Sequence, residues 1–245
     1  MKTIQQHISE RLQLGKKLSN SNYVKHKYFP KTKEELLQII WKITDECEND
    51  KIIDLNSIDT SEITNMSTLF ANNHNNYDIS QWDVSNVEDM NSMFIRSKFN
   101  NDISNWNVSS LKDASYMFEE SIFNQDISRW NVSNVTRMSG MFAFSRFNKD
   151  ISKWNVSNVL SMDSMFMESK FNKDISQWDV SNVQNMNSMF YSSEFNKDIS
   201  QWNVKNVKRL RNIFFNSHFK KDLTPWLDKI TAKSQIRCIS RYCKS

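Results

Sequence analysis

The sequence contains very little glycine and proline, with two residues of each among 245. This scarcity excludes the usual glycine-rich phosphate loops and a flexible linker between domains. No apolar run approaches the roughly 18 residues of a transmembrane helix, so we expect no membrane span. The chain starts with Met1 and lacks the apolar core of a secretory signal, which favours a cytoplasmic over a surface location.

Residues that carry chemistry are also scarce. The three cysteines, Cys47, Cys238 and Cys243, form no disulfide framework, which favours a reducing compartment. The four histidines are scattered, and neither H-E-x-x-H nor G-x-S-x-G occurs. We therefore expect no enzyme, no metal site and no cofactor.

What the sequence does have is a repeat. The motif Asp-Ile-Ser-x-Trp recurs every 24 residues, and no insertion interrupts the register. Its copies begin at Asp78, Asp102, Asp126, Asp150, Asp174 and Asp198, with degenerate copies at Asp54 and Asp222. A fixed period of this length predicts a stack of similar units, each covering the apolar face of its neighbour.

The unit 150–173 divides into two apolar groups. These are Ile151, Trp154 and Val156, then Val159, Met162, Met165 and Phe166. The first group has the L-x-x-L-x-L spacing of a short strand, and the second has helical spacing behind Ser157 as a helix cap. The pattern predicts an α/β fold, a right-handed leucine-rich-repeat-like solenoid of strand–helix coils with helical caps at both ends. It also favours a buried tryptophan column over an exposed aromatic stripe.

The full motif is Phe-Asn-x-Asp-Ile-Ser-x-Trp-Asn/Asp-Val-Ser-Asn-Val-x-x-Met-x-x-Met-Phe. It resembles the BspA-like, or Mycoplasma-lipoprotein-associated, repeats of bacterial surface proteins over roughly residues 54–226. It is also similar to the Treponema-type leucine-rich repeat, with Met-Phe-x-x-Ser where that type has Ala-Phe-x-x-Cys. The resemblance implies a solenoid used for adhesion or protein recognition, without catalytic residues.

Three regions are expected: a helical N-terminal cap at 1–53, about seven to eight coils at 54–226 and a basic C-terminal cap at 227–245. In the first cap, Ile4, Ile8 and Leu12 predict a short helix. Thr32 and Glu35 form a capping box for a second helix. The apolar face expected for that helix is Leu36, Leu37, Ile40, Trp41, Ile43 and Cys47.

Charge is unevenly distributed. Residues 1–34 hold eight Lys/Arg and two Asp/Glu, residues 35–204 hold 13 and 24, and residues 205–245 hold 11 and 2. The basic ends could bind a polyanion such as a nucleic acid, above all through Lys205, Lys208, Arg209 and Arg211. Alternatively, these cations only keep the caps soluble. The Asp column of the motif could in principle hold Ca²⁺, but a ladder of structural turns is the favoured interpretation.

Some positions change in size and charge from copy to copy while the apolar positions hardly change, which favours a scaffold that binds another protein. The first predicted partner-binding surface is the expected strand face, a column of Gln81, Asn105, Arg129, Lys153, Gln177 and Gln201. Strands would present these side chains from a rigid backbone. The rival surface is a more apolar patch at the helix ends, Phe144, Met167, Tyr191 and Phe215. Nothing in the sequence indicates the oligomeric state.

Overall fold

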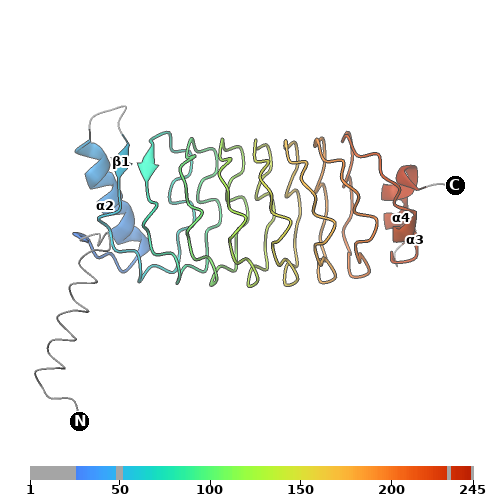
Figure 1. Ribbon diagram of the computed structural model, residues 1–245, viewed down its shortest axis with the longest axis horizontal. Coiled ribbons are helices and arrows are strands. Elements are labelled where there is room, and N and C mark those ends of the chain that lie inside the picture. Colours follow the sequence, from blue (N-terminus) through green and yellow to red (C-terminus); the bar gives the residue numbers. More distant parts are fainter. Residues whose placement is uncertain (1–25, 48–51, 231–232, 244–245) are drawn as a thin grey trace, which may run out of the picture.

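The computed structural model describes residues 26–47, 52–230 and 233–243. The chain forms a row of coils stacked along the long axis, with α2 at one end and α3 and α4 at the other (Figure 1). The elements are α2 (Lys33–Asp45), β1 (Ile53–Asp54), β2 (Tyr77–Asp78), α3 (Thr224–Leu227), α4 (Lys233–Ile239) and the 3₁₀ helix η1 (Ser240–Tyr242). Strands β1 and β2 pair in parallel, with Ile53 opposite Tyr77.

The second half of each described coil is a series of turns, where a helix was predicted. Met165 N donates to Met162 O, and Ser169 N donates to Phe166 O. Ser164 inside the first of these turns has φ +55°, the left-handed value that a type II turn requires. Since such a residue reverses the side-chain alternation, Met162, Met165 and Phe166 all reach the interior at a spacing that imitates a helix. The helix prediction was wrong for this reason.

The same half of the coil carries the backbone hydrogen bonds between coils. Met162 N, Ser164 N, Phe166 N and Glu168 N donate to carbonyls of the next coil over 2.7–2.9 Å. Parallel bridges continue this pairing from Asn65 through to Arg209 in steps of 24. We call residues 161–168 and their equivalents 24 residues apart the ladder arc.

Residues 151–156 do not form the predicted strand. Residues 150–157 and their equivalents, here called the turn arc, make tight turns such as the one closed by Trp154 N on Ile151 O at 3.1 Å. Within the described chain, no backbone–backbone hydrogen bond joins 150–157 to a neighbouring coil. The apolar spacing was read correctly as inward-facing. Apart from the first coils, where β1 pairs with β2, the backbone pairing lies on the ladder arc.

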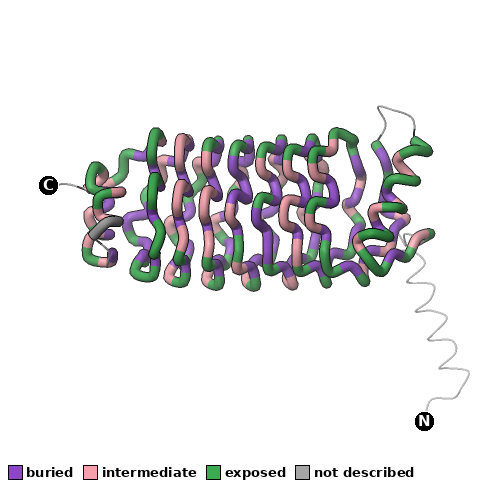
Figure 2. The backbone as a smooth tube through the Cα atoms, turned by 180° about the vertical axis from the view of Figure 1, so that it is seen from behind, coloured by how far each residue is buried: buried purple, intermediate pink, exposed green. Residues whose placement is uncertain are grey.

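The tryptophan column is buried, as predicted, with each ring from Trp82 to Trp226 at most 4% exposed. Each indole also binds the previous coil, since Trp154 Nε1 donates to Ile127 O at 3.1 Å and the other copies repeat this bond. Phenylalanines stack beside it, with the Phe142 and Phe166 ring centroids 5.8 Å apart. Figure 2 shows the buried positions recurring along the row of coils.

Helix α2 begins as the capping box predicted, because the Thr32 side chain accepts a hydrogen bond from Glu35 N at 3.2 Å. Leu36 and Ile40 are buried against the first coil. Trp41 is 63% exposed and Cys47 is also exposed, so the predicted apolar face was wrong for both. The helix predicted from residues 4–12 lies outside the described residues.

The C-terminal end is covered by three short helical pieces, where the sequence predicted one capping helix. From η1, the ring of Tyr242 packs on Phe214 and Phe219 at 5.2 and 5.6 Å between centroids. Its hydroxyl donates to Phe214 O at 2.9 Å. These contacts hold η1 against the last phenylalanines of the core.

Candidate recognition surface

The first predicted surface, the polar column, is exposed at all six positions. Its members Gln81, Asn105, Arg129, Lys153, Gln177 and Gln201 lie on the turn arc. Because backbone pairing lies on the ladder arc, the argument that strands hold this column rigid no longer applies. Binding by the column stays a prediction.

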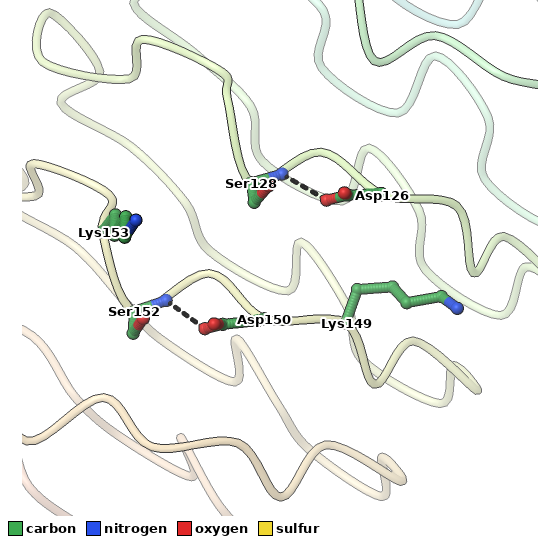
Figure 3. Close-up of a pocket in the computed structure, with 6 residues that line it drawn as sticks. All are labelled: Asp126, Ser128, Lys149, Asp150, Ser152 and Lys153. Carbon is green, nitrogen blue, oxygen red and sulfur yellow. Dashed lines mark hydrogen bonds between the residues drawn. The ribbon is translucent and has the colours of Figure 1, made fainter.

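A depression lies beside the column between two coils (Figure 3). It is lined by Asp126, Ser128, Lys149, Asp150, Ser152 and Lys153. Each aspartate accepts a hydrogen bond from the backbone amide of the serine two residues later, at 2.9 Å. These amides, then the serine hydroxyls, hold the pKa of Asp126 and of Asp150 below the ordinary value. Both carboxylates are thus charged at neutral pH and engaged in local turns.

The other copies of the motif repeat this turn. The aspartates that accept from the amide two residues on are Asp78, Asp102, Asp126, Asp150, Asp174 and Asp198. The repeated aspartates of the motif therefore form a ladder of turns, which is the interpretation that the sequence favoured. Among the described residues, no group of three or more His, Cys, Asp or Glu side chains is arranged to hold a metal ion.

The structure places the rival patch, which we call the apolar strip, on successive coils of the ladder arc. Met167, Tyr191 and Phe215 share one repeat position, and Phe144 lies one position further along its coil. Phe144 N donates to Met167 O, Glu168 N to Tyr191 O and Ser192 N to Phe215 O, so these residues occupy four successive coils. Phe144 and Phe215 are 41% and 47% exposed. The rings of Tyr191 and Phe215 stack with centroids 5.4 Å apart.

Sequence reasoning missed one residue of the strip. The Arg241 guanidinium lies 5.9 Å from the centre of the Phe215 ring, within cation–π range. Arg241 comes from η1, outside the repeat, so no periodic signal could have placed it there. At this end the strip therefore joins apolar surface to positive charge.

Charged side chains on the ladder-arc side of the middle coils pair across 24 residues. Lys112 bridges Glu88 at 2.8 Å, and the Arg137 Nε atom lies 2.8 Å from Asp113 Oδ2. Further pairs join Arg96 to Glu120 and Lys170 to Glu194. Opposite charges at the repeat spacing were the sequence signal for these pairs. Except for the buried Asp113, their side chains are exposed or half-exposed, so the other three pairs contribute little stability but cancel local charge.

The predicted polyanion residues, Lys205, Lys208, Arg209 and Arg211, are all exposed near the C-terminal end. Lys208 Nζ donates to Gln184 Oε1 at 3.2 Å. In the described part of the chain, none of the four has an acidic partner within ion-pair distance. Four cations of the middle coils are thus paired with a carboxylate on a neighbouring coil, whereas the four cations predicted to bind a polyanion are not.

None of the helices that the structure describes is long and apolar enough to cross a membrane. No curated protein and no solved structure matched the chain. A family model described as Mycoplasma protein of unknown function, DUF285, matches twice in tandem, at residues 40–146 and 121–226. The two matches confirm a repeat protein, and they fit the Mycoplasma-lipoprotein-associated repeats that the motif resembles. Because the matches together span most of the sequence, the chain belongs to the DUF285 family.

Proposed function

We propose that the chain is a non-catalytic repeat scaffold that recognises another protein. As part of this proposal, the coils form a right-handed solenoid related to the BspA-like and leucine-rich repeats, with turns in place of the helix. The support is that the buried positions hardly differ between coils, while exposed positions differ in size and charge. Such a chain presents a variable surface on a repeated frame.

The apolar strip is the surface best suited to that task. A line of exposed and half-exposed aromatic and thioether side chains is typical of the residues that dominate protein interfaces. The strip is also mounted on the ladder arc, where each coil is hydrogen-bonded to the next. The observation that carries the proposal is this line, Phe144, Met167, Tyr191 and Phe215, over four successive coils.

Paired variants test the strip against the polar column. Partner proteins are first captured from the native cell and identified by mass spectrometry, and the affinity of a purified partner is then measured. Phe144→Ala with Phe215→Ala should weaken binding by about tenfold or more, because two interface aromatics lose their contacts. Both side chains are about half-exposed, so we expect a smaller change in the melting temperature than from a buried aromatic residue.

The matched comparison is Arg129→Glu with Lys153→Glu in the polar column. If this pair abolishes binding while the strip variant binds normally, the column is the recognition surface. If neither variant changes the affinity for any captured partner, protein recognition by these surfaces is wrong.

Polyanion binding is the second candidate function, favoured by the unpaired cations of the last coil. Phosphate contacts release counterions, so such binding weakens steeply as salt rises. Affinity for RNA or DNA that stays micromolar or better at physiological salt would place this function above the first.

A further inference from the structure

From its second position onward, the ladder arc donates its backbone hydrogen bonds in one direction along the stack; its first position donates the other way, as Asn185 N does to Leu160 O. In the interior, amides at alternate positions donate to the following coil, as Ser164 N does to Asn187 O and Phe166 N to Met189 O. Their peptide groups are therefore aligned. At these alternate positions, the first coil must present carbonyls at its outer edge, and the last coil must present amides.

At the C-terminal edge, the register identifies these amides as those of Leu210, Asn212, Phe214 and Asn216. None of them finds an acceptor among the described residues. The equivalent amides one coil earlier, at Ser188 and Ser192, each donate over 2.8 Å. Leu210 and Phe214 are buried, so the donors that an extended chain can reach, as on an exposed edge strand, are the amides of the exposed Asn212 and Asn216.

The side chains around these amides make the edge more positive. Aligned peptide groups leave partial positive charge at their amide end, which nearby carboxylates would stabilise. Instead, Lys208 and Arg209 stand where the coil at 88–91 has Glu88 and Asp89, and Arg211 follows two residues later. Positive side chains beside positive amide ends repel one another in the free protein, and a bound anionic partner would relieve this repulsion.

The cap leaves room at the edge. Tyr242 covers the ring of Phe214, but the side chains of Arg209, Arg211, Asn212 and Asn216 remain exposed. The interior shows what an acidic residue on one further coil would do. Arg96 Nη2 lies 3.0 Å from Glu120 Oε1 on the following coil, and Arg96 Nε donates to the other oxygen at 3.1 Å.

We propose that this C-terminal edge, residues 208–216, binds an extended acidic segment of a partner protein. Carbonyls of the segment accept hydrogen bonds from the unpaired amides, and its carboxylates pair with Arg209 and Arg211. The inference rests on the proposed function and specifies the chemistry of the partner.

The test uses the full chain and a fluorescent peptide of alternating Glu and Thr, about ten residues long, enough to span one strand. Fluorescence anisotropy should show saturable binding. Hydrogen exchange at Asn212 and Asn216 should slow on binding, while the amides of Ser188 and Ser192 are already protected.

Arg209→Glu with Arg211→Glu should weaken peptide binding by about tenfold or more, since each charge-assisted pair is lost and reversed. Lys98→Glu with Lys173→Glu makes the same change in net charge at two exposed positions outside the edge, the strip and the column, and it should leave binding unchanged. Equal melting temperatures of both variants and the parent would show that folding is intact.

Four results would overturn the proposal. In the first the peptide does not bind, and in the second it binds without slowing exchange at Asn212 and Asn216. A single-stranded oligonucleotide of equal charge that binds more tightly, and is lost in the same variant, would make the edge a polyanion site. Self-association in sedimentation that disappears with Arg209→Glu and Arg211→Glu would assign the edge to a second copy of the chain.

Failure here is separable from failure of the proposed function. If Phe144→Ala with Phe215→Ala weakens binding of the captured partner while the acidic peptide does not bind the parent protein, the edge proposal is wrong and the proposed function stands.

Discussion

The two arcs of the coil are joined to their neighbours by different chemistry. On the turn arc, side chains make the connections: Trp154 Nε1 reaches Ile127 O, and Asn158 Nδ2 reaches Ser133 O. On the ladder arc the backbone itself does so. A contact made by a side chain needs the same residue in every coil, whereas a backbone contact does not. This explains why the turn arc repeats its motif and the ladder arc varies, and it makes the ladder arc the better place for recognition.

Removing a turn-arc anchor should cost the most. Trp154→Ala deletes a ring that is 3% exposed, together with its hydrogen bond to the previous coil. We expect a loss of about 3–5 kcal/mol in the free energy of unfolding. Urea denaturation measures this loss. The control is Glu168→Ala, a change at an exposed position of the ladder arc, which should alter the free energy of unfolding by no more than about 0.5 kcal/mol. Equal losses would contradict the difference between the arcs.

The asparagine ladder beside the turn arc should come next. Asn148 Oδ1 accepts from Asn172 N at 3.0 Å, and Asn124 Oδ1 accepts from Asn148 N in the same way. Asn148→Ala leaves the Asn172 amide without this acceptor, which costs about 1–3 kcal/mol. Thermal denaturation measures the loss, and Asn148→Asp should recover most of it because a carboxylate oxygen can accept the same bond. A variant as stable as the parent would show that water replaces the side chain.

Gly140 is a position of the ladder arc where a larger residue is not tolerated without a cost in stability. Its φ is +60°, and a Cβ there would lie 2.3 Å from Cδ1 of Tyr116 on the previous coil. Gly140→Ala should cost about 1–2 kcal/mol from the left-handed backbone alone, and more if the ring cannot move. Adding Tyr116→Ala should remove only the steric part, which a double-mutant cycle in urea measures. Additive effects would mean that the ring moves freely.

Acid should weaken the turn arc through its aspartates. Local hydrogen bonds lower the pKa of three aspartates. The largest contribution comes from the Ser128 amide for Asp126 and from the Ser152 amide for Asp150. For Asp179 it comes from the Ser181 side chain. A lowered pKa stabilises the fold above the unfolded value near 4, and this stability is lost as the pH falls through the folded pKa. The melting temperature should drop below about pH 4.

A triple variant sharpens this effect. Asp126→Asn, Asp150→Asn and Asp179→Asn should keep the turns at neutral pH, because Asn155 Oδ1 already accepts from Ser157 N in this way. The variant should lose less stability than the parent between about pH 4 and pH 2. Parallel pH profiles would show that other groups control the acid transition.

Part of the candidate surface was readable from the sequence. Periodicity alone placed Arg129 and Lys153 in one column, and Met167, Tyr191 and Phe215 in another. It could not place Arg241 beside Phe215, because η1 lies outside the repeat. Nor could periodicity indicate the unpaired amides of Asn212 and Asn216, because the direction in which a backbone amide points cannot be read from the identity of the side chains.

By itself, the sequence determined the 24-residue register, the buried tryptophan column and the start of α2 at Thr32. Each of these follows from side-chain chemistry that is local or strictly periodic. Only the tertiary structure decided which arc carries the backbone ladder. The spacing of Met162, Met165 and Phe166 suits a helix as well as a chain turned by Ser164 at φ +55°. The choice depends on whether each amide finds its carbonyl within its own coil or in the next one, and that acceptor exists only once the coils are stacked.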